Sequence, residues 1–168
     1  MSDEKQFESF YESTRKPLYG YLFGIVGEKA LAQDLFQESY LRFLNANVKA
    51  MDDATKRAYL FRIAANLVND HFRRRKREQD KVTQLMIETT EMETAAMPLD
   101  SRPVEFALAQ LPTQNRSLLW LAYVEQFDHV KIAEMLGIQK GSVKVLLFRA
   151  RQKMLSLLSG EIKKTKRS

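Results

Sequence analysis

The sequence predicts an all-α protein built from two small helical domains that a flexible linker joins. Apolar residues recur at three- and four-residue steps, and strict alternation is missing. Proline and glycine, at 4 and 6 of 168 residues, are sparse. The helical periodicity decays between residues 78 and 103, where threonine, glutamate and methionine dominate. We therefore expect domains at residues 1–80 and 104–160, a linker at 81–103 and a basic tail at 161–168.

Composition favours a polyanionic partner. A net charge of +6 and a pI near 9.5 suit contacts with a phosphate backbone, although a merely basic soluble protein fits these values equally well. The lack of cysteine excludes disulfides and thiolate zinc sites, and it is compatible with a reducing cytosol. No stretch approaches the roughly 20 apolar residues of a membrane span, and the acidic start lacks a signal core. We expect a cytoplasmic protein with no membrane insertion.

Three helices are predicted for the N-terminal domain. The first covers residues 7–27, where Pro17 starts a new helix or introduces a kink and Gly27 ends the segment. The second covers residues 28–46 and turns a set of apolar side chains inward: Ala32, Leu35, Phe36, Tyr40 and Phe43. A polar loop at residues 45–53 leads to the third helix, which covers residues 54–77.

The third helix combines aromatic, amide and basic side chains on one side. Helical spacing aligns the residues that we call the strand-binding face: Tyr59, Arg62, Asn66, Asn69 and Arg73. Such side chains stack on bases and form hydrogen bonds with them, which suits unpaired bases more than an intact duplex. The basic run at residues 73–77 adds phosphate affinity, although cations at a helix end also complement the helix dipole without any ligand.

The second helix carries a different polar side. Asp34, Gln37, Glu38 and Leu41, which we call the acidic ridge, lie at positions i, i+3, i+4 and i+7 and therefore face the same way. An acidic patch with an exposed leucine would repel DNA, so it favours a protein partner. An ordinary solvated helix surface fits the spacing equally well.

The C-terminal domain has the form of a helix-turn-helix. Asp128 can cap a first short helix, Gly137 suits the left-handed conformation at its end, and a longer basic helix begins near Lys140. The outward residues of this second helix form what we call the recognition face: Lys140, Ser142, Lys144, Val145, Phe148, Arg149 and Arg151. The alternative is a helical hairpin with a solvated basic surface.

The recognition face contains several kinds of candidate DNA contact. Lys144 or Arg149 could bond guanine edges, and Val145 or Phe148 could touch a thymine methyl. Arg151 is better suited to holding a phosphate. The sequence offers no matching support for catalysis or a cofactor, because the two histidines lack further ligands at metal spacing and no phosphate-binding glycine loop is present.

Two groups of motifs resemble the bacterial sigma factors. Region 2 of that family is similar to residues 32–42 (AQDLFQESYLR) and 59–67 (YLFRIAANL). Region 4 is similar to residues 108–112 (LAQLP), 132–138 (IAEMLGI) and the segment that follows them, GSVK with RAR. Two such regions with a short linker resemble the extracytoplasmic-function (ECF) group of the sigma-seventy family.

The resemblance implies a role in transcription initiation without enzymatic activity. It implies binding to core RNA polymerase, both the β′ clamp helices and the β subunit, with the acidic ridge on the clamp helices. The strand-binding face and the loop at 45–53 would capture unpaired bases of the minus-ten element of promoter DNA. The recognition face would read the minus-thirty-five element as duplex, and the linker would thread toward the RNA channel. Activity in this group is often restrained by an anti-sigma factor.

The chain departs from the family pattern in two places. Val145-Leu146-Leu147-Phe148 stands where many relatives carry Ser-Arg-Leu-His, which removes polar base contacts. Phe43-Leu44 replaces a common Ala-Trp pair, and we interpret it as a packing exchange.

Two other functions fit parts of the sequence. A stand-alone helix-turn-helix transcriptional regulator would bind its operator tightly without polymerase. A helical interaction module would use its basic surfaces on acidic proteins.

Overall fold

The computed structural model of the chain describes residues 2–85 and 103–166, and within these ranges all regular secondary structure is helical. This confirms the predicted fold class. The predicted linker at 81–103 lies mostly outside the described residues, so its expected path toward the RNA channel does too. No helix in the described part of the chain has the length and apolar character that crossing a bilayer demands.

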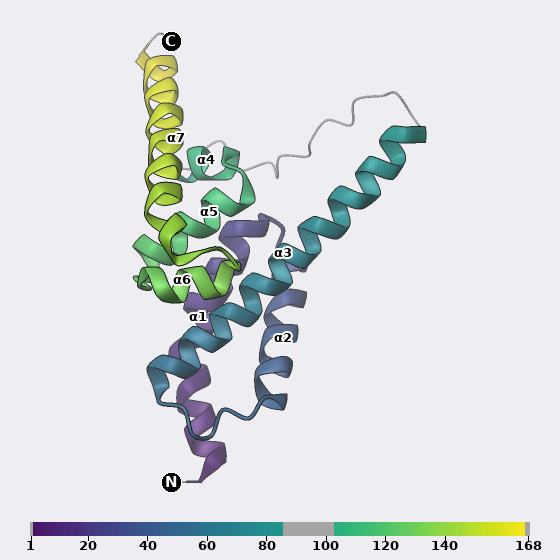
Figure 1. Cartoon of the computed structure of the whole chain (residues 1–168), viewed down its shortest axis with the longest axis vertical. Helices are drawn as coiled ribbons and strands as arrows, with labels where there is room; N and C mark the ends of the chain where they lie inside the picture. Colours follow the sequence, from purple (N-terminus) through teal and green to yellow (C-terminus); the bar gives the residue numbers. More distant parts are fainter. Residues whose placement is uncertain (1, 86–102, 167–168) are drawn as a thin grey trace.

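The N-terminal half consists of three long helices, α1 (Asp3–Val26), α2 (Lys29–Asn45) and α3 (Asp53–Leu85), drawn from purple to teal in Figure 1. Pro17 lies inside α1 and starts no new helix. Its neighbours Thr14 and Leu18 are buried, so the packing of α1 offsets the few kcal/mol that an interior proline costs. Helix α3 continues to Leu85, beyond the predicted end at residue 77.

The C-terminal half contains α4 (Pro103–Gln110), α5 (Thr113–Leu119), a π-helical turn η1 (Trp120–Val124), α6 (His129–Leu136) and α7 (Lys140–Lys166). Asp128 caps α6, because its Oδ1 accepts a hydrogen bond from the Lys131 backbone N–H at 2.9 Å. Gly137 ends α6 at φ 64°, in the left-handed conformation. The predicted helix-turn-helix is therefore present. Helix α7 also includes most of the segment predicted as a tail.

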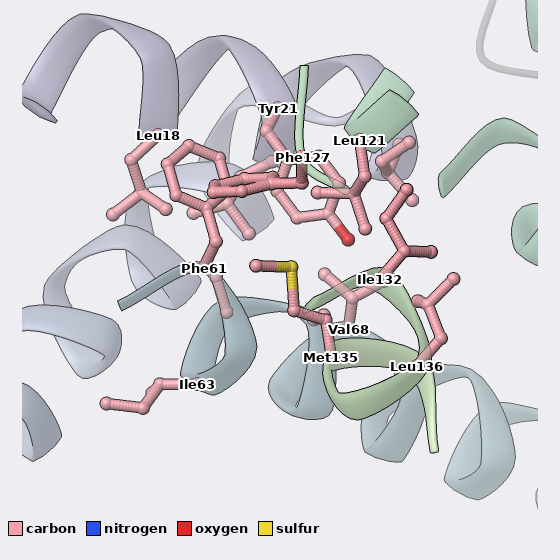
Figure 2. Close-up of a cluster of buried hydrophobic side chains, with 14 of the residues drawn as sticks. Leu18, Tyr21, Phe61, Ile63, Val68, Leu121, Phe127, Ile132, Met135 and Leu136 are labelled. Atoms are coloured by element: carbon pink, nitrogen blue, oxygen red, sulfur yellow. The ribbon is translucent and has the colours of Figure 1, made fainter. Parts of the chain in front are cut away.

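The two halves share one hydrophobic core. Helix α6 lies against α3, and side chains from both halves meet between them (Figures 1 and 2). The rings of Phe61 in α3 and Phe127 ahead of α6 pack edge-on with centroids 5.3 Å apart. Ile132 and Met135 of α6 are almost fully buried in the same cluster. Each half therefore covers apolar surface that the other would leave in water.

This interface widens the buried side of α3. We predicted one apolar stripe that includes Leu60, Ile63 and Leu67, and all three are buried. The structure also buries Phe61, Ala65 and Val68, which form a second stripe at helical spacing. Helix α3 is covered on two sides because it packs against α6 in addition to α1 and α2.

Trp120 packs tightly against Gly24 of the other half. A Cβ atom added to Gly24 would stand 2.5 Å from Cζ3 of Trp120, so only glycine allows the indole ring to lie against α1. One turn earlier, a Cβ on Gly20 would meet the same ring at an ordinary 3.9 Å. The group that packs at these glycines comes from the other half.

Polar contacts surround this approach, and we call them the domain clasp. Arg57 Nη2 donates to Glu125 Oε2 at 2.5 Å, and the guanidinium carbon lies 4.5 Å from the centre of the Phe127 ring. Arg116 Nη1 donates to the Ile25 carbonyl at the end of α1 at 2.6 Å. The Arg116 guanidinium is partly buried there, and this burial lowers its pKa from the usual value. Glu125 is only 9% exposed, so losing its arginine would leave a carboxylate poorly solvated.

Gly24→Ala should destabilise the wild type by about 1–3 kcal/mol, because the new methyl group collides with the indole ring. In a Trp120→Ala background the same change should be neutral, or stabilising by up to about 1 kcal/mol, since alanine is the better helix former. Urea unfolding of the four proteins measures this coupling. Gly20→Ala is the matched control and should not destabilise. Equal effects of Gly24→Ala in both backgrounds would contradict the close approach.

Alkaline pH should weaken the same interface through Tyr21, whose hydroxyl lies 3.3 Å from Ser117 Oγ. Burial raises the pKa of Tyr21 to about 12, above its ordinary value of 10.0. Its stabilising contribution is therefore complete below pH 10.0 and lost as the pH rises toward 12. Tyr21→Phe should be about 1 kcal/mol less stable than wild type at neutral pH. This difference in stability should disappear as the pH rises toward 11. If urea unfolding gives the same difference between the two proteins at every pH, the role assigned to the buried Tyr21 hydroxyl is refuted.

Candidate nucleic-acid and protein interfaces

The acidic ridge lies on the outer side of α2. Asp34, Gln37 and Leu41 are exposed, and Leu41 leaves 56% of its surface in water. Glu38 is half-buried, and its Oε1 accepts a hydrogen bond from Arg42 Nε at 2.9 Å. Arg42 therefore offsets part of the charge of Glu38, and Asp34 carries the less compensated carboxylate of the ridge.

Leu44 extends this surface, although the sequence pattern did not indicate it. The interpretation of Phe43-Leu44 as a packing exchange is right for Phe43, whose ring is buried and stacks on Phe10 with centroids 4.9 Å apart. It is wrong for Leu44, which is 55% exposed one helical turn after Leu41. The i, i+3 spacing of two leucines was the signal that could have revealed it.

The strand-binding face lies along one side of α3. Arg62, Asn66 and Arg73 are exposed, whereas Tyr59 and Asn69 are half-buried. The Tyr59 ring lies 6.4 Å from that of Phe43, so part of its surface is already covered by α2. The five side chains leave amide, guanidinium and aromatic groups accessible in one row.

The first turn of this face borders helix α6. Tyr59 and Arg62 line a shallow cleft of about 240 Å³ together with residues of α6, namely Lys131, Glu134 and Met135. A nucleotide strand that approaches Tyr59 therefore meets α6 beside it. The cleft does not include Asn66, Asn69 or Arg73, which lie farther along α3.

The recognition face is presented by the first three turns of α7. Val143, Leu147 and Ala150 are buried and fix the helix against the rest of the C-terminal half. The outward side chains are half-buried at Ser142 and exposed at the remaining positions: Lys140, Lys144, Val145, Phe148, Arg149 and Arg151. Val145 and Phe148 are 49% and 53% exposed, so two apolar groups stand among four cations.

Tyr123 is a second residue of these surfaces that the sequence pattern did not indicate. Its hydroxyl accepts a hydrogen bond from Arg151 Nη1 at 2.5 Å, and the Arg151 guanidinium carbon lies 5.9 Å from the centre of the Phe148 ring. Tyr123, Lys144 and Arg151 line one hollow beside the recognition face. The tyrosine lies in η1, the π-helical turn that follows α5.

Comparison with known proteins places both sets of motifs in one family. Residues 10–78 match the model of sigma-70 region 2, and residues 101–154 match that of sigma-70, region 4. The ECF RNA polymerase sigma factor SigL of Mycobacterium tuberculosis is 31% identical over 141 residues, which cover 81% of this chain and 79% of SigL. The chain belongs to the ECF group of RNA polymerase sigma factors.

The similarity to more distant relatives covers nearly the full length of both chains. The ECF RNA polymerase sigma factor SigM of Bacillus subtilis is 24% identical over 153 residues, covering 89% of this chain and 93% of SigM. RpoE of Bartonella quintana, solved with the anti-sigma factor NepR, has a similar fold, with a TM-score of 0.70 at 22% identity over 92% of this chain and 98% of that one. CnrH, solved with the cytosolic domain of CnrY, gives a TM-score of 0.66 at 19% identity over 95% and 91% of the two chains.

Proposed function

We propose that this sigma factor brings core RNA polymerase to specific promoters through three surfaces with separate tasks. The observation that carries the proposal is that three chemically different faces stay open to solvent on three different helices. They are the acidic ridge on α2, the strand-binding face on α3 and the recognition face on α7. Each suits a different partner: a protein, unpaired bases and duplex DNA.

The acidic ridge is the proposed dock for the β′ clamp helices of core polymerase. A carboxylate surface on a protein with net charge +6 would be repelled by DNA, so it serves protein recognition. Leu41 and Leu44 add adjacent apolar area, which supplies affinity that charge pairs at a solvated rim do not. Leu44 therefore joins the proposed contact surface.

The two remaining faces would divide the promoter between them. On α3, Asn66 and Asn69 offer amide groups to base edges, and Arg62 and Arg73 offer charge to the phosphates of a melted minus-ten strand. On α7, the recognition face enters the major groove of the minus-thirty-five duplex. The protein acts in the cytoplasm beside the polymerase and performs no catalysis itself.

Binding both elements requires the two halves to separate. The names of the elements place them about 25 base pairs apart, or roughly 85 Å along B-DNA at 3.4 Å per base pair. In the structure α6 packs directly against α3 beside Tyr59 and Arg62. The domain clasp must therefore open on the way to a promoter complex, and the free sigma factor should bind promoter DNA poorly. RpoE was solved with the anti-sigma factor NepR and CnrH with the cytosolic domain of CnrY, and an anti-sigma factor is proposed as a partner of this chain as well.

Reversing the charge of the acidic ridge tests polymerase docking. Asp34→Lys with Glu38→Lys should lower promoter-dependent transcription by core polymerase at least tenfold, because the variant presents cations where the clamp should meet acids. Run-off transcription and copurification with core polymerase measure this. The matched control is Glu4→Lys with Glu8→Lys, which changes the net charge equally on exposed positions of α1. Promoter-dependent transcription that is absent with the wild type, or intact in the ridge variant, would refute the docking role.

Removing the amides of the strand-binding face should separate opening from recruitment. Asn66→Ala with Asn69→Ala should lower the fraction of melted promoter about tenfold while holoenzyme binding to the duplex falls less than about threefold, because amide contacts to bases form only after the bases unpair. Permanganate footprinting reports melting, and gel shifts report recruitment. A template with a pre-opened minus-ten bubble should restore transcription, and Gln6→Ala on α1 controls for loss of an exposed amide. Equal losses in both assays would contradict the role of this face.

A further inference from the structure

Two apolar side chains occupy the middle of the recognition face. Val145 and Phe148 lie three residues apart on α7, so their side chains are neighbours on one side of the helix. About half of each residue's surface is exposed, at 49% and 53%. Lys144 and Arg149 adjoin them in the sequence, and both are exposed. An isolated exposed apolar residue needs no explanation, but an adjacent pair surrounded by cations does.

The surrounding charge identifies the polyanion that covers this pair. Exposed cations at Lys140, Lys144, Arg149 and Arg151 favour a polyanion such as the phosphate backbone of a duplex. A recognition helix contacts base edges with its N-terminal turns, and Val145 and Phe148 lie in the second and third turns of α7. The apolar pair thus lies where bases, rather than phosphates, are read.

We propose that Val145 and Phe148 read thymine by its methyl group in the duplex that the recognition face binds. The C5-methyl of thymine is the apolar group that base pairs present in the major groove, and neither side chain can form a hydrogen bond with any other feature there. This inference rests on the proposed function and adds a sequence preference to it. The sigma factor selects thymine at these positions by apolar contact.

The same pair would act against guanine and cytosine. Guanine presents two acceptors in the major groove and cytosine presents an amino donor. Burying these groups against valine and phenylalanine would remove their water without supplying a partner, which is unfavourable. The contact therefore discriminates in two ways, since it stabilises thymine and penalises a G·C pair.

Phe148 is held in place for this task. Arg151 lies over one side of its ring at 5.9 Å from the centroid and is itself fixed by the Tyr123 hydroxyl at 2.5 Å. This contact limits the motion of the ring before DNA binds, so less side-chain entropy is lost on binding. Tyr123 is thus a positioning residue that acts through Arg151.

Replacing thymine by uracil tests the proposal, because the exchange removes only the methyl group. Holoenzyme assembled from core polymerase and this sigma factor would first select upstream duplexes from a random library, and each enriched thymine would then be replaced by deoxyuridine. At one or two positions the replacement should weaken holoenzyme binding about threefold to fivefold, the value expected for one buried methyl-sized group.

The variants link each methyl to its side chain. Val145→Ala or Phe148→Ala should bind thymine and uracil duplexes with equal affinity at the affected position, while the wild type distinguishes them. Leu155→Ala is the matched control, because Leu155 is equally exposed on α7 but lies beyond the recognition turns. The control should keep the wild-type preference. Circular dichroism melting checks that each variant is folded.

The outcomes separate this inference from the proposed function. If the holoenzyme transcribes from specific promoters but uracil is tolerated at every enriched thymine, methyl reading is wrong and the sigma-factor role stands. The same holds if no thymine is enriched, or if the alanine variants still distinguish uracil. If promoter-specific transcription is absent altogether, the proposed function fails with it.

Discussion

The contact between Trp120 and Gly24, with the domain clasp around it, is the constraint on which the arrangement of the two halves depends. The indole ring reaches α1 only because residue 24 has no Cβ. Arg57 then meets Glu125, and Arg116 donates to the Ile25 carbonyl at the end of α1. These contacts place α6 on α3, which in turn fixes which part of the strand-binding face is open. The contact between Trp120 and Gly24 thus influences access to the strand-binding face on α3.

The three proposed surfaces illustrate how one short chain treats three partners differently. Carboxylates with exposed leucines suit a protein, because they oppose DNA and add apolar area. Amides on α3 suit bases that have lost their partners, since both groups need hydrogen bonds. Apolar groups among cations on α7 suit a groove in which phosphates supply attraction and methyl groups supply discrimination. In each case the chemistry of the side chains, rather than the helical fold, sets the partner.

Local signals in the sequence predicted most of the fold and the positions of the surfaces. Asp128 and Gly137 marked the ends of α6, and three-to-four residue periodicity placed the inner sides of α2 and α3, since both effects act within a turn or two of helix. The packing of the halves was not predicted, because Tyr21 meets Ser117 across 96 positions and no local pattern records that distance. The local signal of this packing was the second apolar stripe on α3, which consists of Phe61, Ala65 and Val68. Leu44 and Tyr123 were missed for related reasons: the first was assigned to packing by analogy, and the second acts through Arg151.

The glycine at position 24 also affects how much background activity this sigma factor would have. Under the proposed function only the separated form engages a promoter, so the population of that form sets the background level of expression. Each 1.4 kcal/mol lost from the contact between the halves raises that population about tenfold while it remains the minor form. A single added methyl group on α1 would therefore raise background expression without changing any residue of the proposed DNA-binding faces.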